Sequence, residues 1–340
     1  MAGEDNATAP PPQARPGRRG ALDRDGAAEQ NRAMIRVHFI LGPTGVGKGA
    51  VARELARRVG GQVLSVDSMK VYRRMDIGTA KPTPAERAAV CHHGIDLVEP
   101  SESFSVARYV EHADRALAAV AAAGDVALAA GGTGLYIKAL SEGLFAGPGA
   151  DASIRARLRA RASAEGLAAL HAELASADPE AAGRIHPNDE KRIVRALEVH
   201  EQTGRPISEL QRQWDRERTR YDCVFVGLRR TREDLNRRIN ARVRRMMERG
   251  LREEVAGLLA EPAGLSAQAA QALGYAEMIA HLRGRCGLEQ AVERIKINTR
   301  RFARKQHTWF RRLRAVRWID VADEAPVGSV ADEAVGLLEP

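Results

Sequence analysis

The chain has 340 residues, an apolar fraction of 44% and a formal net charge of +9. This length suits one large or two modest globular domains, and no apolar run approaches the roughly 18 residues of a membrane-spanning helix. Three widely spaced cysteines (Cys91, Cys223 and Cys286) make neither a disulfide framework nor a zinc site, so we expect a reduced, cytoplasmic compartment.

The positive charge is unevenly distributed along the chain. Residues 1–33 carry five Arg and five acidic residues and are rich in Pro, Gly and Ala, so we expect a disordered tail there. Residues 145–220 nearly balance, with 13 basic and 12 acidic residues, whereas residues 229–317 carry 22 basic against 9 acidic residues. Because such a local field attracts polyanions, we favour a nucleic-acid partner over a merely solvated Arg-rich surface.

The first half of the chain alternates between strand and helix patterns. Strands are predicted at 34–41, 62–67 and 125–132, and helices at 49–58 and 104–122. This alternation is typical of an α/β protein whose parallel sheet is covered on both faces, with ligands outside the carboxyl ends of the strands.

Residues 146–220 follow a different pattern, in which helix succeeds helix. The predicted segments are SIRARLRARASAEG, LAALHAELASADPEAAGRI, DEKRIVRALEVHEQTG and ISELQRQW. A strand returns at 223–228, so the sequence predicts an all-helical insertion in an α/β core made of 34–145 and 221–322.

The end of the core is basic. The segment LNRRINARVRRMMERG carries an apolar stripe, and a further helix is predicted at about 287–312. VRWID, residues 316–320, predicts a last strand, and residues 323–340 are expected to form a loose tail.

A phosphate-binding loop follows the first strand. Gly42 to Lys48 match the pattern G-x-x-x-x-G-K-[ST], but Gly49 stands at the hydroxyl position that ligates Mg²⁺ in nucleotide hydrolases. Successive backbone N–H groups, the following helix N-terminus and Lys48 would cradle an anion. The predicted diphosphate- or nucleotide-binding residues are Gly42, Pro43, Thr44, Gly45, Val46, Gly47, Lys48 and Gly49.

Asp67 ends the second strand and would face the same crevice. Its position alone leaves open whether it is a functional carboxylate or a cap of the next turn. The long polar excursion at residues 65–82 is the kind of loop that holds a substrate.

Several motifs together carry a family resemblance. They are GPTGVGKG, SVDSMKVYRRMDIGTAKP, GGTGLY (131–136), HPNDEKRIVRALEV (186–199), ALGY (272–275) and RKQHTWF (304–310). Over about residues 34–320 the chain resembles tRNA dimethylallyltransferases (tRNA isopentenyltransferases) of bacterial type. The resemblance implies a P-loop NTPase-like core and transfer of a dimethylallyl group from dimethylallyl diphosphate to N6 of the adenosine 3′ of the anticodon, tRNA position 37.

The resemblance also implies roles for individual residues. Catalytic positions would be Asp67 as general base, Lys48 and Thr133. The tRNA-binding positions would be Asp67, Ser68, Met69, Lys70, Thr133, Arg155, Lys191, Arg192, Ile193, Val194 and Arg195. Arg238 or Arg242 would clamp the diphosphate, although either is also compatible with a solvated helix face.

Three positions depart from the family pattern. Gly49 replaces the usual Ser or Thr, Lys70 stands where Gln is usual, and Ala276 stands where a basic residue is usual. Because the loop lacks its hydroxyl ligand, we expect Mg²⁺ to be bound through the diphosphate, held by its oxygens, by water and by an acidic group such as Asp67. The expected partners are a tRNA anticodon stem-loop and dimethylallyl diphosphate, with a monomeric enzyme and no membrane.

Alternatives remain at this stage. One is a P-loop kinase or ATPase with a helical lid, which the loss of the metal ligand disfavours. Another is a catalytically weakened RNA-binding relative, suggested by Gly49.

Two segments also have alternative interpretations. The segment KRIVR (191–195) is compatible with an ordinary amphipathic helix whose Ile193 and Val194 pack inside. Trp309 and Phe310 are candidates either for stacking on bases or for the core.

Overall fold

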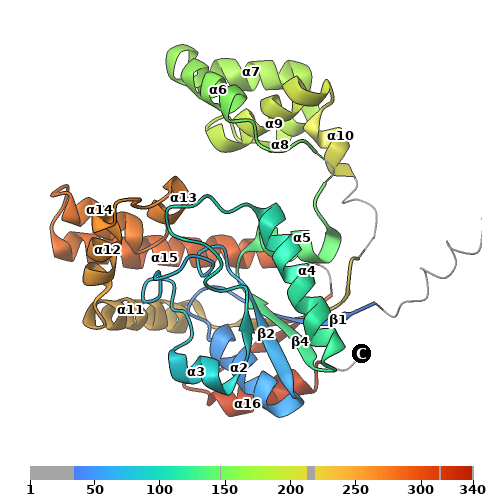
Figure 1. Ribbon diagram of the computed structural model, residues 1–340, viewed down its shortest axis with the longest axis vertical. Helices are drawn as coiled ribbons and strands as arrows, with labels where there is room; N and C mark the ends of the chain where they lie inside the picture. Colours follow the sequence, from blue (N-terminus) through green and yellow to red (C-terminus); the bar gives the residue numbers. More distant parts are fainter. Residues whose placement is uncertain (1–33, 146, 213–218, 314, 339–340) are drawn as a thin grey trace, which may run out of the picture. The chain divides into compact units, whose positions relative to one another are not determined.

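The computed structural model describes residues 34–145, 147–212, 219–313 and 315–338, and the predicted disordered tail at 1–33 lies outside them. Its sheet has the strand order β3-β2-β4-β1-β5-β6, and every pairing is parallel (Figure 1). The strands are β1 (Arg36–Leu41), β2 (Gly61–Val66), β3 (His92–His93), β4 (Val126–Gly131), β5 (Asp222–Arg229) and β6 (Val316–Asp320). The α/β prediction is confirmed, and β3 is a short strand that the sequence pattern did not indicate.

Both faces of the sheet are buried, as a parallel sheet requires. Along β1, Val37, Phe39 and Leu41 face one hydrophobic cluster, while Ile40 faces the other. The first cluster includes α4 (Val106–Ala122) and α5 (Gly134–Glu142), and the second includes α2 (Lys48–Val59).

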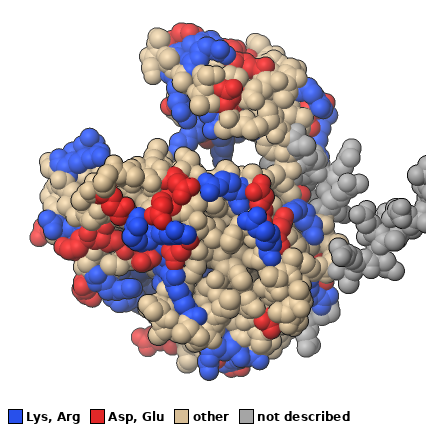
Figure 2. Space-filling model, in the orientation of Figure 1, with Lys and Arg blue, Asp and Glu red and all other residues tan. Residues whose placement is uncertain are grey.

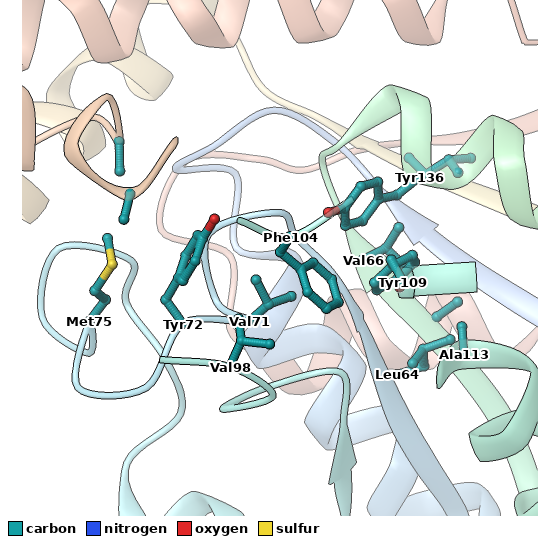
Figure 3. Close-up of a cluster of buried hydrophobic side chains, with 14 of the residues drawn as sticks. Leu64, Val66, Val71, Tyr72, Met75, Val98, Phe104, Tyr109, Ala113 and Tyr136 are labelled. Atoms are coloured by element: carbon teal, nitrogen blue, oxygen red, sulfur yellow. The ribbon is translucent and has the colours of Figure 1, made fainter. Parts of the chain in front are cut away.

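The first cluster extends under the polar excursion that follows β2. Figure 3 shows Tyr72, Phe104 and Tyr136 in this cluster, and the rings of Tyr109 and Tyr136 stack with centroids 4.0 Å apart. The buried apolar area of this cluster therefore fixes the loops at the carboxyl ends of the strands.

Further helices of the core are α3 (Pro84–Ala89), α11 (Arg232–Glu248), α12 (Leu251–Ala260), α13 (Ala267–Ala270), α14 (Tyr275–Leu282) and α15 (Leu288–Phe310).

The insertion is all-helical, as predicted, and has a hydrophobic cluster of its own. Its helices are α6 (Ala152–Glu165), α7 (Leu167–Ala177), α8 (Pro179–Arg184), α9 (Glu190–Thr203) and α10 (Ile207–Gln211). The run 167–185, predicted as one helix, is broken at Asp178, whose carboxylate accepts hydrogen bonds from Ala181 N and Ser208 N. Pro179 explains the break, because proline has no N–H to continue α7.

The prediction of a loose tail at 323–340 is wrong for residues 327–335. These residues form helix α16 (Val327–Val335), which packs on α2 and buries Val330, Ala331 and Ala334. Arg58 of α2 also pairs with Asp332. The C-terminal segment thus completes the second face of the sheet. Within the described ranges, no helix has an apolar stretch long enough to cross a membrane.

A substitution in α16 tests this packing. Ala331 is fully buried, so Ala331→Glu should lower the free energy of unfolding by about 2–4 kcal/mol, because an unpaired carboxylate enters an apolar cluster. Urea unfolding measures the loss. Glu333→Ala, on the exposed side of the same helix, should change the value by less than about 0.5 kcal/mol. Equal stability of both variants would contradict the packing of α16.

Candidate active site

Three neighbouring strands bring the site together. The phosphate loop follows β1, Asp67 follows β2, and the GGTGLY segment follows β4, which lies between these two strands. A cavity of about 830 Å³ opens at these strand ends, lined by the loop, Asp67, Lys70, α11 and Gln306 of α15. This is the position at which parallel α/β sheets bind ligands.

The phosphate loop has the backbone that its glycines predict. Gly42, Gly45 and Gly47 all have positive φ, and a Cβ on Gly42 would lie 2.7 Å from Leu228 O. The chain then enters α2 at Lys48, so that the first N–H groups of this helix point outward without partners inside the helix. The loop is therefore an anion cradle of backbone N–H groups.

Basic side chains surround this cradle, and they have few hydrogen-bond acceptors near them. The Lys48 ammonium has a single weak contact, 3.4 Å to Pro43 O, and Arg242 donates to Thr44 Oγ1 at 3.3 Å. The ammonium of Lys70 has no hydrogen-bond or ion-pair partner among the described residues. Asp67 is the carboxylate that faces this group of cations, and it does not neutralise them.

The pKa values of these cations reflect the same excess of positive charge. Burial lowers the pKa of Lys48 to about 7, the positive charges of Arg242 and Lys70 add to the decrease, and Asp67 opposes it. Burial also lowers the pKa of Lys70 and that of Arg242, again against the pull of Asp67. A polyanion in the cavity would remove this repulsion.

Both candidate clamp residues reach the loop from α11. Arg238 Nε donates to Gly45 O at 3.1 Å, one helical turn before Arg242. Their i,i+4 spacing places the two guanidinium groups on one face of α11. The structure thus brings both to the phosphate loop, and their clamping role stays a prediction.

Asp67 serves one structural contact and keeps one oxygen free. Its Oδ1 accepts from Met69 N at 2.9 Å and more weakly from Lys70 N at 3.4 Å, which caps the turn after β2. Within the described residues, no donor is bonded to its Oδ2. The cap and the functional reading are therefore compatible, because each uses a different oxygen.

Thr133 ties the neighbouring strand end to this turn. Its Oγ1 accepts from Ser68 N at 3.1 Å, and its own N–H donates to Val66 O. The predicted positions 67, 68 and 133 therefore lie together. This arrangement holds the free carboxylate oxygen at a fixed height above the sheet.

Gln306 is a site residue that the sequence analysis missed. It is buried, its Oε1 accepts from Thr44 N at 2.8 Å, and its Nε2 donates to Gly132 O at 2.8 Å. One amide thus joins the phosphate loop to the GGTGLY segment. The motif RKQHTWF contained this glutamine, but no local pattern indicated that its partners lie at residues 44 and 132. In the same motif, Phe310 is buried in the core, while Trp309 is partly buried.

The protein donors do not form a metal site. Position 49 has no hydroxyl, and among the described residues no group of three or more His, Cys, Asp or Glu side chains is arranged to hold an ion. Asp234, which also lines the cavity, is paired with Arg230 and Arg237. The donor set therefore does not fit a metal ion ligated by the loop.

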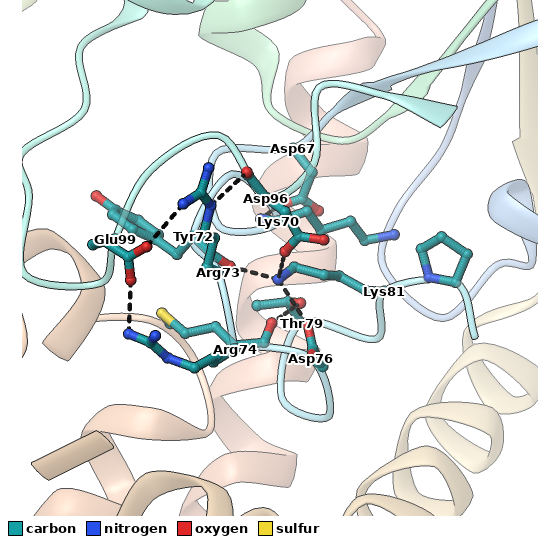
Figure 4. A network of polar contacts seen from close by, with 12 residues as sticks. Asp67, Lys70, Tyr72, Arg73, Arg74, Asp76, Thr79, Lys81, Asp96 and Glu99 are labelled. Atoms are coloured by element: carbon teal, nitrogen blue, oxygen red, sulfur yellow. Dashed lines mark hydrogen bonds and ion pairs between the residues drawn. The ribbon is translucent and has the colours of Figure 1, made fainter. Parts of the chain in front are cut away.

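The polar loop after β2, residues 67–82, is held by hydrogen bonds with Lys81 inside the loop and with Glu254 of α12. Lys81, whose side chain is 1% exposed, donates to Tyr72 O and to the carboxylates of Asp76 and Asp96 (Figure 4). Glu254 accepts from the backbone N–H groups of residues 76, 77 and 78 and from the hydroxyl of Tyr275. Gly78 packs against the ring of Tyr275, where a Cβ would lie 2.4 Å from Cε2. The DIGTAKP and ALGY motifs thus meet in a buried contact.

The predicted tRNA-binding positions in the insertion fall into two groups. Ile193 and Val194 are buried in its hydrophobic cluster, so their side chains pack inside the insertion, and tRNA binding at these two positions stays a prediction. Arg155 makes a two-pronged contact of 2.9 Å with buried Glu198, and Arg195 donates to the same carboxylate. These two arginines are therefore positioned by Glu198.

Lys191 and Arg192 lie on the exposed face of α9. The Arg192 side chain is 73% exposed and pairs with Asp189, and Lys191 Nζ donates to Gln271 Oε1 at 2.9 Å. On the face drawn in Figure 2, basic and acidic side chains lie next to one another. The acidic neighbours limit the net field of this face.

The fold and the cavity define the class of protein. The described part of the chain combines an all-parallel sheet, a phosphate loop after an inner strand, and cations at the strand ends that make no ion pair. These are features of a P-loop protein that binds a phosphorylated ligand. A family model described as IPP transferase matches residues 70–313, and one described as isopentenyl transferase matches residues 35–92. The chain belongs to the tRNA dimethylallyltransferase family.

Relatives and solved structures agree with this assignment. A tRNA dimethylallyltransferase of Geobacter sulfurreducens is 49% identical over 291 residues, covering 86% of this chain and 94% of that protein. One of Geobacter metallireducens is 48% identical over 285 residues, covering 84% and 92%.

Two solved structures are similar over most of the chain. The full-length tRNA isopentenylpyrophosphate transferase of Bacillus halodurans has a TM-score of 0.65 at 40% identity, covering 90% of this chain and 97% of that one. A eukaryotic dimethylallyltransferase described as acting on tRNA has a TM-score of 0.74 at 27% identity, covering 88% and 77%.

The lowered pKa of Lys48 predicts proton uptake when an anion binds. Below about pH 7 this lysine is charged with or without ligand; above it, the empty site must take up a proton, so affinity for pyrophosphate falls as pH rises. Calorimetry at pH 8 in buffers of different ionisation enthalpy should give about one more proton taken up by the natural chain than by Lys48→Arg. Equal proton numbers would contradict this prediction.

Gln306→Leu tests the bridge between the two loops. The substitution leaves the partly buried Thr44 N–H and the buried Gly132 C=O without partners, so the free energy of unfolding should fall by about 1–3 kcal/mol. Pyrophosphate affinity should fall about tenfold as the loop loosens. Lys305→Ala, on an exposed neighbouring position, is the control. Unchanged stability and affinity in Gln306→Leu would exclude a bridging role.

Proposed function

We propose that the chain transfers a dimethylallyl group from dimethylallyl diphosphate to N6 of the adenosine 3′ of the anticodon, tRNA position 37, and releases diphosphate. The observation that carries the proposal is one cavity with an anion cradle, unpaired cations and a carboxylate with one free oxygen. Membership of the family supplies the transferred group and the tRNA acceptor.

The carboxylate of Asp67 is placed to assist attack by the acceptor, the exocyclic amine of an adenine. The lone pair of an adenine N6 is conjugated into the ring, so this amine is a poor nucleophile, and it must lose a proton as the new C–N bond forms and the allylic C–O bond breaks. Asp67 Oδ2 is the proposed general base, and such a base contributes about 10²–10⁴-fold to the rate. Thr133 and the Met69 N–H keep that oxygen in place by holding the turn.

The cations at the phosphate loop are placed to stabilise the leaving group, the diphosphate. Negative charge grows on the diphosphate as the allylic C–O bond breaks, and donors already in place stabilise it without reorganisation. The loop N–H groups, Lys48 and Arg242 are proposed to do this, with Arg238 holding the loop through Gly45 O. Mg²⁺ would accompany the diphosphate on its own oxygens and would need no protein ligand.

The RNA must present its base to this cavity. Extruding one nucleotide from a stacked anticodon loop costs a few kcal/mol, which contacts to the rest of the stem-loop must offset. The exposed Lys191 and Arg192, together with Arg155 and Arg195 held by Glu198, are proposed phosphate contacts. Because the cavity is built from one chain, the proposal needs no second copy.

Asp67→Asn is the sharpest test of the base. The amide oxygen can still accept from Met69 N–H, so the turn is kept while the proton acceptor is lost. The prenylation rate on an anticodon stem-loop should fall about 10²–10⁴-fold, while pyrophosphate affinity stays within about threefold. Glu111→Gln, an exposed change, is the control.

The assay also separates the alternatives. The natural chain is incubated with the stem-loop, dimethylallyl diphosphate and ATP, and products are identified by mass spectrometry of nucleosides and by phosphate release. Prenylated adenosine is the expected product. ATP hydrolysis without prenylated RNA would assign a kinase or ATPase, and full activity of Asp67→Asn would remove the base from its role.

A further inference from the structure

Gly49 is not required by its surroundings. It lies in the first turn of α2 outside the positive-φ region, and a Cβ there would meet only Arg53 Nη1, at an ordinary 3.5 Å. Serine at this position would therefore fit without strain. The missing hydroxyl is thus a chemical difference from the general phosphate-loop pattern, in which it ligates Mg²⁺.

A cation from the loop after β2 lines the cavity that Gly49 lines. Lys70 lines the cavity together with Gly49 and Arg53. In Figure 4 its side chain is drawn apart from the dashed contacts that hold Lys81. Its ammonium has no hydrogen-bond or ion-pair partner in the part of the chain that the structure describes, so it is available to a ligand. Arg53, one turn after Gly49, is oriented by Glu86.

The cavity lining carries an excess of positive charge for a diphosphate. A diphosphate ester has about three negative charges near neutral pH, by the acidities of phosphate groups. Nine Lys or Arg residues line the cavity, Lys48, Lys70 and Arg242 among them, against the four acidic residues Asp67, Asp234, Asp323 and Glu324. Among the described residues, Lys70 adds to this excess a positive charge that makes no ion pair, whereas no group of acidic, His or Cys side chains is arranged to hold a divalent cation.

We propose that Lys70, with Arg53 beside it, supplies the positive charge that a loop-ligated Mg²⁺ supplies in phosphate loops with Ser or Thr at position 49. The chain then binds diphosphate with little dependence on Mg²⁺. This inference rests on the proposed function, because it takes the ligand of the cavity to be a diphosphate.

Pyrophosphate binding to the full chain, measured by calorimetry in EDTA and in MgCl₂, tests the inference without relying on turnover. In the natural chain the two dissociation constants should differ by less than about threefold. In Lys70→Gln, affinity in EDTA should fall about tenfold or more and MgCl₂ should recover most of the loss, whereas Lys70→Arg should keep the natural behaviour.

The loop position provides a second, independent pair of variants. Gly49→Ser restores a metal ligand, so MgCl₂ should strengthen its pyrophosphate binding severalfold relative to EDTA. Gly49→Ala adds the same Cβ without the hydroxyl and should show no such gain. This pair decides the question even if Lys70→Gln does not fold, which thermal melting reveals.

The outcomes separate this inference from the proposed function. Binding of pyrophosphate by the natural chain only when Mg²⁺ is present would overturn the inference and leave the transferase proposal intact. An equal loss in both buffers for Lys70→Gln would also overturn it, since Lys70 would then act independently of the metal. No binding in either buffer would count against the diphosphate site itself.

Discussion

The structure depends on the concentration of like charge at one end of a buried parallel sheet. Lys48, Lys70 and Arg242 share a cavity with Asp67. Burial lowers the pKa of each of these cations, and neighbouring positive charges add to the decrease, among them Arg242 at Lys48 and Lys70, and Arg245 at Arg242. Such an arrangement costs stability in the empty protein and is relieved by a polyanion. Ligand affinity is therefore built into the folded state as unbalanced charge.

The rest of the core serves to hold that charge in place. The large apolar cluster under the polar excursion, the Lys81 contacts and the Glu254 contacts together fix a long loop that has little regular structure. Gln306 fixes the phosphate loop to the adjacent strand end with two hydrogen bonds. Rigidity of these loops matters because preorganised donors stabilise developing charge without first having to move.

The sequence predicted the parts of the molecule whose signals are local. The strands, the phosphate loop and the position of Asp67 each depend on a run of about ten residues or fewer, and the structure has them where they were expected. The role of Gln306 was out of reach, because its partner Thr44 lies 262 positions away in the chain. Helix α16 was missed, although Val327, Val330, Ala331 and Ala334 follow helical spacing.

In the segment KRIVR the buried side chains follow the amphipathic pattern, and whether the segment meets tRNA stays a prediction. Ile193 and Val194 lie in a segment matched to tRNA contacts, yet their apolar side chains are buried as an amphipathic helix requires. The site residues of the core are expected to bind through charge, and in the insertion the predicted tRNA-binding positions with charged side chains are Lys191 and Arg192 on the exposed face of α9 and the two arginines held by Glu198.

The most direct measurement is a crystal structure with a non-hydrolysable thiolodiphosphate analogue of the prenyl donor and an anticodon stem-loop. The account predicts the diphosphate on the loop N–H groups within hydrogen-bond reach of Lys48, Lys70 and Arg242, and Asp67 Oδ2 within reach of the extruded adenine N6. A diphosphate bound elsewhere, or an adenine whose N6 lies on the far side of the cavity from Asp67, would contradict it.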